Sequence, residues 1–93
     1  MPTKHVLTKK VEIVNKRGLH ARASAKFVSC ARTFDCDIQV THKGMTVPAV
    51  SVMGLMMLVA STGSIVELSA QGPQADKALD TLAALVATKF GED

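Results

Sequence analysis

Four short stretches of the chain have the hydrophobic and polar pattern of strands with one buried face. They lie at residues 11–14, 36–41, 45–47 and 66–70. The second and third are separated by His42-Lys43-Gly44, a turn-like triplet that predicts a β-hairpin, and Pro48 ends that hairpin. Residues 15–18 have the composition of a turn and end the first strand.

Between the strands, hydrophobic residues recur at steps of three and four, the period of a helix with one buried face. This pattern predicts helices at residues 21–34 and 78–90, and a short apolar helix at 50–59 that Ser51 can cap. The buried stripe of the first helix consists of Ala23, Phe27, Cys30, Ala31 and Phe34, and that of the last of Ala78, Leu79, Leu82, Leu85, Val86 and Phe90. Lys89 and Gly91 are typical of a helix C-terminus.

The predicted order of elements is β-α-β-β-α-β-α. Hairpin connections favour a four-stranded, mainly antiparallel sheet, and three helices with one apolar stripe each would pack on one face of it. The expected fold class is therefore α+β, an open-faced β-sandwich. Because 93 residues suit one hydrophobic core, residues 1–93 are expected to form a single domain.

Composition argues against several classes of protein. The hydrophobic share is 47%, but the most apolar run, residues 47–60, is interrupted by Pro48, Ser51 and Gly54 and is too short to cross a bilayer. No signal-peptide pattern opens the chain, so we expect a cytoplasmic protein without membrane insertion. Cys30 and Cys36 lack the spacing of a zinc or redox site, so we interpret them as reduced structural thiols and expect no metal.

The first residues that suggest chemistry are Gly18-Leu19-His20-Ala21-Arg22, at the predicted start of a helix. The first N–H groups of a helix lack intrahelical partners, and the helix dipole favours an anion there. A phosphoryl group held on the His20 imidazole would be met by these donors and by the Arg22 guanidinium. On spacing alone, however, a histidine at a helix start is more commonly a cap or a surface residue.

A second segment decides between these interpretations. Gly18-Leu19-His20-Ala21-Arg22 followed by an amphipathic helix resembles the active segment of HPr, the histidine-containing phosphocarrier family of the bacterial phosphotransferase system. Residues 51–56, Ser-Val-Met-Gly-Leu-Met, resemble the regulatory-serine segment of that family, at a fitting distance from His20. Two separated motifs in register are far more specific than either alone, and the resemblance extends over about residues 11–90.

The resemblance implies a stoichiometric phosphoryl carrier rather than a turnover enzyme, and no cofactor. Enzyme I, phosphorylated from phosphoenolpyruvate, would pass its phosphate to Nδ1 of His20, Arg22 would contact the phosphate, and an enzyme IIA-type domain would accept it. Ala23 stands where the family commonly has proline. This departure slightly favours the regulatory branch of the family, which signals nitrogen or carbon status. The branch that feeds sugar transport remains an alternative.

By the same resemblance, Ser51 matches the serine that a regulatory HPr kinase/phosphorylase phosphorylates. A phosphate there would add about −1.5 to −2 charges to the docking surface. The alternative role of Ser51 is that of a helix N-cap, and the two roles are compatible.

Residues 52–58 are apolar on most sides of one short helix, which cannot bury all of itself. About half are expected in the core, and the rest suit a docking patch for partner proteins beside His20. The candidate docking residues are Val52, Met53, Leu55 and Met56, with Arg17, Lys26 and Lys16 as a basic rim. His5 and His42 are interpreted as ordinary surface histidines.

A nucleic-acid-binding module is the competing class, because small basic β-α-β-β-α-β proteins include RNA binders. Such modules stack bases on aromatic side chains presented by strands. This chain has a net charge of only +3, no Tyr or Trp, and its three Phe residues fall on the predicted helix stripes. We therefore expect no nucleic-acid partner. The carrier is also expected to be a monomer.

Overall fold

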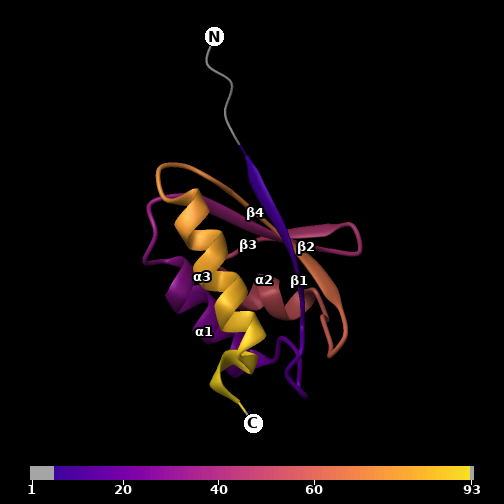
Figure 1. Ribbon diagram of the computed structural model, residues 1–93. Helices are drawn as coiled ribbons and strands as arrows, with labels where there is room; N and C mark the ends of the chain where they lie inside the picture. The colour runs from indigo at the N-terminus through magenta and orange to yellow at the C-terminus, as the bar shows by residue number, and fades with distance from the viewer. Residues whose placement is uncertain (1–5, 93) are drawn as a thin grey trace.

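The structure is a computed structural model that describes residues 6–92. Its elements follow the predicted order: β1 (Leu7–Glu12), α1 (Ala21–Ala31), β2 (Asp37–His42), β3 (Met45–Pro48), α2 (Val52–Met57), β4 (Ile65–Gln71) and α3 (Ala75–Ala87), with a 3-10 turn at Lys89–Gly91. The helices lie together against one side of the sheet (Figure 1). The predicted open-faced α+β sandwich is therefore confirmed.

The four strands form one sheet in the order β1-β4-β2-β3, and every neighbouring pair is antiparallel. The inward-facing residues Val40, Val66 and Leu68 are at most 2% exposed, and they pack with the apolar stripes of α1 and α3 into one continuous core. Burial of each such side chain stabilises the fold by about 1.5–3 kcal/mol. No helix within residues 6–92 is long and apolar enough to cross a membrane.

The first strand lies earlier in the chain than the predicted residues 11–14. β1 is an edge strand whose side chains are nearly all exposed, so residues 7–10 carry little alternation for a pattern to detect. Ile13 leaves the strand and is fully buried, and its N–H donates to the carbonyl of Ser64 at 2.8 Å. Hydrophobicity at Ile13 and Val14 thus marks the entry to the core rather than the strand itself.

All three helices also end earlier than predicted, α2 at Met57 rather than at residue 59. α1 stops at Ala31, because Thr33 N–H donates to the Cys30 carbonyl in a turn, although Phe34 still packs half-buried against the core. α3 stops at Ala87, and Lys89, Phe90 and Gly91 follow with φ angles of 59°, 55° and 75°. Phe90 is 1% exposed, so its predicted burial is confirmed, but a left-handed turn buries it rather than a helical stripe.

His42 is not the surface residue that the sequence predicts. It is 7% exposed at the end of β2, and its Nδ1–H donates to the carbonyl of Leu58 at 2.9 Å. This bond satisfies a carbonyl at the C-terminal end of α2, where helices leave unpaired acceptors. The hydrogen bond from the buried His42 ring therefore links β2 to the end of α2. The other histidine interpreted in this way, His5, lies outside the described residues.

Candidate functional site

A loop between β1 and α1 holds His20. Gly18 allows this loop to lie directly against the segment that connects α2 to β4. Gly18 has a φ of +66°, and a Cβ atom there would lie 2.5 Å from the carbonyl oxygen of Ala60. The next N–H, that of Leu19, donates to the same oxygen at 2.9 Å. Only glycine fits this approach, which gives a physical reason for the first residue of the Gly-Leu-His motif.

His20 is the N-cap of α1, so the capping role and the predicted site involve the same side chain. Its Nδ1 accepts a hydrogen bond from the backbone N–H of Arg22 at 3.2 Å. A neutral imidazole that accepts at Nδ1 carries its proton at Nε2. The Nε2–H donates to Oε2 of Glu92, near the end of the chain. The Nδ1 lone pair thus faces the N-terminus of α1.

The second oxygen of Glu92 is held by Asn15. The Asn15 side chain is fully buried, and its Nδ2 donates to Glu92 Oε1 at 3.0 Å and to the Gly18 carbonyl at 2.8 Å. Sequence analysis missed both residues, because Asn15 has only a turn-like composition and Glu92 is 72 positions from His20. No local pattern could have joined them.

The left-handed turn at residues 89–91 brings Glu92 back to the site. The buried ring of Phe90 anchors this turn, and Lys26 Nζ donates to the Phe90 carbonyl at 2.8 Å. Lys26, predicted as a docking residue, therefore also holds the C-terminal segment against α1.

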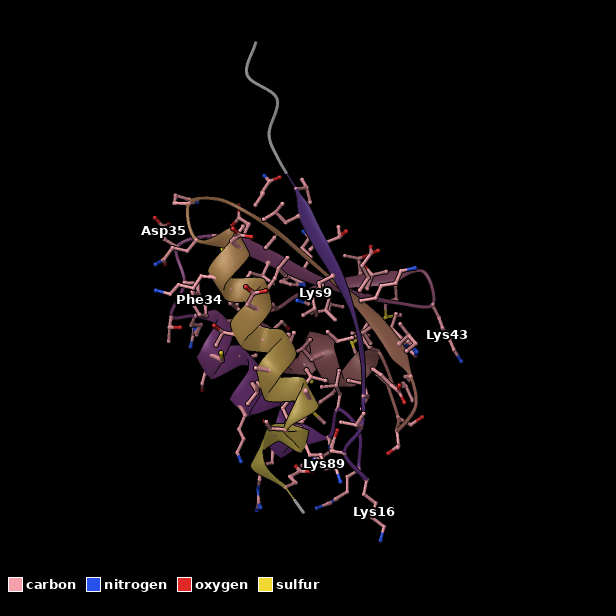
Figure 2. The ribbon with its side chains drawn as sticks, in the orientation of Figure 1. Lys9, Lys16, Phe34, Asp35, Lys43 and Lys89 are labelled. Carbon is pink, nitrogen blue, oxygen red and sulfur yellow. The ribbon has the colours of Figure 1, made fainter. Side chains whose placement is uncertain are left out.

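Basic side chains gather around the imidazole. A hollow of about 340 Å³ is lined by Lys16, Arg17, His20, Arg22, Lys26, Gly91 and Glu92. Figure 2 shows Lys16 and Lys89 at the same end of the molecule, next to the C-terminus. The predicted cluster of His20, Arg22, Arg17 and Lys26 is thus assembled in one place, with charge and donors suited to a phosphate.

The predicted apolar docking residues divide into two groups. Met53 and Met56 are exposed, at 72% and 41%, whereas Leu55 is fully buried. Leu55 as a docking residue is therefore wrong: it faces the core of the sandwich, and Val52 is half-buried against the same core. Sequence periodicity over a six-residue helix leaves this division open, since the packing of α2 against α1 and β3 decides which side is covered.

Ser51 is the N-cap of α2, as predicted. Its Oγ accepts from the Gly54 N–H at 2.9 Å, and its side chain is half-buried. A Cβ at Gly54 would lie 3.0 Å from that Oγ and 3.1 Å from Cβ of Val47, so glycine lets α2 lie close over β3. The Ser51 hydroxyl therefore serves as the hydrogen-bond acceptor that caps α2.

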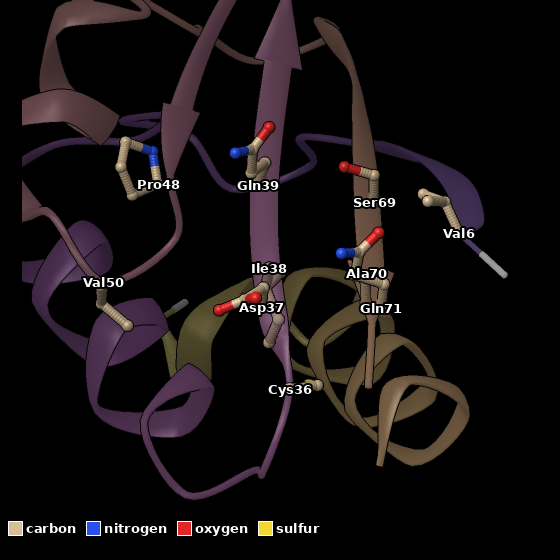
Figure 3. Close-up of a pocket in the computed structure, with 10 residues that line it drawn as sticks. All are labelled: Val6, Cys36, Asp37, Ile38, Gln39, Pro48, Val50, Ser69, Ala70 and Gln71. Atoms are coloured by element: carbon tan, nitrogen blue, oxygen red, sulfur yellow. The ribbon is translucent and has the colours of Figure 1, made fainter. Parts of the chain in front are cut away.

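A different hollow, of about 380 Å³, lies on the face of the sheet away from the helices (Figure 3). Asp37, Gln39, Ser69 and Gln71 point toward it from β2 and β4. It contains one carboxylate and neutral amides, and none of the predicted site residues line it. The nucleophiles that line it are the Ser69 hydroxyl and the Cys36 thiol. Burial and the charges of Asp35 and Asp37 raise the pKa of the Cys36 thiol, which disfavours its reactive thiolate form, so the His20 end is the better candidate.

The pKa of Glu92 is expected to show this network directly. The hydrogen bond from Asn15 is the largest cause that lowers its pKa below the ordinary value of 4.5; contact with His20 and the charge of Arg17 act in the same direction, and partial burial opposes them. We expect an NMR titration of the Glu92 carboxyl carbon to give a lowered pKa, and Asn15→Ser to raise it.

This shift has a defined effect on stability. Because the folded-state pKa is lowered, the contribution of Glu92 to the free energy of unfolding is present above the unfolded-chain pKa and is lost as the pH falls through the folded-state pKa. The difference in unfolding free energy between the wild type and Glu92→Gln should therefore shrink in acid. An ordinary Glu92 pKa in the wild type would contradict the network.

Comparison with known proteins supplies the family context. Residues 7–88 match the family model described as "PTS HPr component phosphorylation site". The chain is 46% identical to "Phosphocarrier protein HPr" of Cupriavidus necator, with 94% of this chain and 98% of that protein covered. It is 43% identical to "Phosphocarrier protein NPr" of Shewanella violacea, with 92% and 94% covered.

Solved structures agree with this similarity. The fold superposes on the crystal structure of HPr-C-His from Thermoanaerobacter tengcongensis with a TM-score of 0.89 at 42% identity. That comparison covers 94% of this chain and 98% of the other.

Proposed function

The chain belongs to the HPr family of phosphotransferase-system phosphocarriers, and we propose that it carries the phosphoryl group on Nδ1 of His20. The observation that supports this proposal is the orientation of the ring. Nδ1 presents its lone pair to the N-terminus of α1, while Nε2–H is held by Glu92. The geometry thus favours one of the two ring nitrogens as the nucleophile.

The transfer step uses this orientation. The Nδ1 lone pair forms the N–P bond as the bond between phosphorus and the donor protein's leaving atom breaks, and that electron pair stays with the donor. Positive charge that develops on the imidazole is stabilised through Nε2–H by the Glu92 carboxylate. The phosphoryl oxygens then take over the N–H of Arg22, and its exposed guanidinium clamps them.

Asn15 acts through Glu92 rather than on the phosphate. By holding one carboxylate oxygen at 3.0 Å, it leaves the other oxygen directed at Nε2 of His20. The arrangement resembles a carboxylate that orients a histidine in acyl-transfer enzymes, where it sets the tautomer and stabilises the imidazolium. We therefore assign positioning roles to Asn15 and Glu92.

The surroundings of His20 suit partner proteins with acidic surfaces. We infer that enzyme I is the phosphoryl donor and an enzyme IIA-type domain the acceptor, with Met53, Met56 and the half-buried Val52 as apolar contacts and Arg17 and Lys26 as basic ones. The protein would act as a cytoplasmic monomer. Transfer assays with acceptor domains of the sugar-transport and the regulatory type distinguish the two branches.

The decisive experiment incubates the protein with phosphoenolpyruvate and enzyme I. We expect one acid-labile phosphate per chain, and nitrogen-15 NMR should place it on Nδ1 of His20. Arg22→Gln should slow its formation and leave the fold intact, because the guanidinium is exposed. Absence of label on the wild type, or label on Nε2, would refute the proposal.

We further propose Ser51 as a regulatory phosphorylation site. Its Oγ lies at the N-terminus of α2, and a phosphate there would add about two negative charges beside the apolar contacts Met53 and Met56. With an active HPr kinase/phosphorylase, we expect an ATP-dependent, acid-stable phosphate that Ser51→Ala abolishes. Unchanged wild-type mass under those conditions would leave Ser51 as a helix cap only.

A further inference from the structure

Val59 has an unfavourable backbone conformation that burial of its side chain does not explain. Its φ is +51°, in the left-handed region, where a β-branched residue is a genuine outlier. It directly follows Leu58, the C-cap of α2, a position where glycine or asparagine is normally found. The side chain is nevertheless 78% exposed. Folding thus places a strained apolar side chain in solvent.

Comparison with the other strained residues within 6–92 makes Val59 distinct. Lys43 lies with Gly44 in the two-residue turn between β2 and β3, with φ angles of 48° and 82°, where such values match the twist of a hairpin. Lys89 and Phe90 form the turn that buries the Phe90 ring. Lys43, Lys89 and Phe90 thus serve a tight turn or a buried ring. Val59 also ends α2, with its N–H donating to the Met56 carbonyl at 3.2 Å, but glycine would serve that turn without strain, and the valine side chain gains no burial there.

The exposed side chain of Val59 lies beside the proposed phosphoryl site. A hollow of about 280 Å³ is lined by Arg17, Leu19, His20, Met56, Val59, Ala60 and Ser61. Arg17 and His20 also line the basic hollow, so the two hollows adjoin at the imidazole. Met57, 61% exposed, extends the apolar area on α2. Val59 therefore belongs to an apolar wall on one side of His20. Lys16, Arg22 and Lys26 lie on the other side, and Arg17 lines both hollows.

We propose that Val59 is a specificity-determining contact residue, which fits into an apolar depression of an acidic-rimmed partner protein during phosphoryl transfer. The inference rests on the function proposed for His20. Strain held in the free protein at a functional surface is expected where an interaction, rather than folding, depends on the residue. The left-handed turn at Val59 leaves its side chain exposed next to the His20 ring. A right-handed continuation of α2 would direct the side chain elsewhere.

The chemistry of the partner follows from what surrounds Val59. Lys16, Arg17, Arg22 and Lys26 line the adjoining hollow, so a docking surface with an acidic rim is complementary. A protein partner fits this combination better than a small anion, because Val59, Met56 and Met57 add apolar area that a free phosphate would not contact.

Substitutions at Val59 can separate backbone strain from side-chain contact. Val59→Asn and Val59→Gly remove the apolar side chain and tolerate a positive φ, whereas Val59→Leu keeps an apolar side chain there. Lys43→Gly is the matched control, because it relieves a left-handed residue in the hairpin turn and alters no residue that lines the hollows at His20. Each variant is measured for melting temperature and for phosphoryl transfer from enzyme I at varied carrier concentration.

We expect Val59→Asn and Val59→Gly to melt at or above the wild-type temperature, yet to lose about tenfold in kcat/KM through a higher KM for the carrier. Val59→Leu and Lys43→Gly should stay within about twofold of the wild type. Unchanged KM in the Asn and Gly variants, or an equal loss in Val59→Leu, would overturn the inference while labelling of His20 remained intact. A wild type without phosphate on His20 would instead refute the proposed function, and this inference with it.

Discussion

Replacement of His20 by alanine is expected to abolish phosphate incorporation from phosphoenolpyruvate and enzyme I completely. No neighbouring group can replace the nucleophile, because Arg22 and Lys26 are cations and Glu92 has its carboxylate committed to Asn15. The fold should survive, since the loss is that of one helix cap, which costs about 1 kcal/mol. Mass spectrometry and circular dichroism on the same sample measure both effects.

His42 is the matched control for this experiment. It is buried and bonded to the Leu58 carbonyl, so His42→Ala leaves that acceptor without its partner and should cost about 1–3 kcal/mol of stability. The folded variant should still accept phosphate on His20. Full labelling of His20→Ala, or loss of labelling in a folded His42→Ala protein, would show that the phosphoryl group is carried elsewhere.

Truncation of Phe90 to alanine is expected to have the largest effect on stability, a loss of about 3–5 kcal/mol in the free energy of unfolding. The ring is 1% exposed, and total stabilities of small domains are only about 5–15 kcal/mol. The same change should release Glu92 from His20, because Phe90 anchors the turn that returns the chain to the site. Urea denaturation measures the first effect.

The second effect is visible in the Glu92 titration, where Phe90→Ala should raise the lowered pKa toward its ordinary value. Phe34→Ala provides the control: this ring is only half-buried at the end of α1, so a smaller loss of roughly 1–3 kcal/mol is expected, with the Glu92 pKa unchanged. Equal losses of stability in the two variants would contradict the anchoring role of Phe90.

Local patterns in the sequence were sufficient for the order of the elements. The hydrophobic periodicity of α1 and α3, the alternation along β2 and β4 and the turn residues of the hairpin all act over a few residues, so the chain itself encodes them. Ser51 and His20 were located as helix starts for the same reason, and both act as caps. The predicted ends of the elements were less accurate. The exposure of the edge strand β1 and the left-handed turn at residues 89–91 both obscure the hydrophobic pattern there.

Other features depend on contacts between distant parts of the chain. Burial of Leu55 and His42 arises where α2 crosses the sheet, which no short pattern records. The pairing of β1 with β4 is likewise non-local.

The sequence by itself determined the kind of site in this protein: an imidazole at a helix start, an arginine two residues later and a capping serine on a second helix. Only the tertiary structure decided how that imidazole is oriented. Glu92 reaches Nε2 of His20, and Asn15 holds Glu92, because a buried Phe90 turns the C-terminal segment back over α1. Residues 72 positions apart become hydrogen-bond partners through packing. This contact leaves the Nδ1 lone pair directed at the Arg22 N–H, and the proposed role of Nδ1 as the nucleophile rests on that orientation.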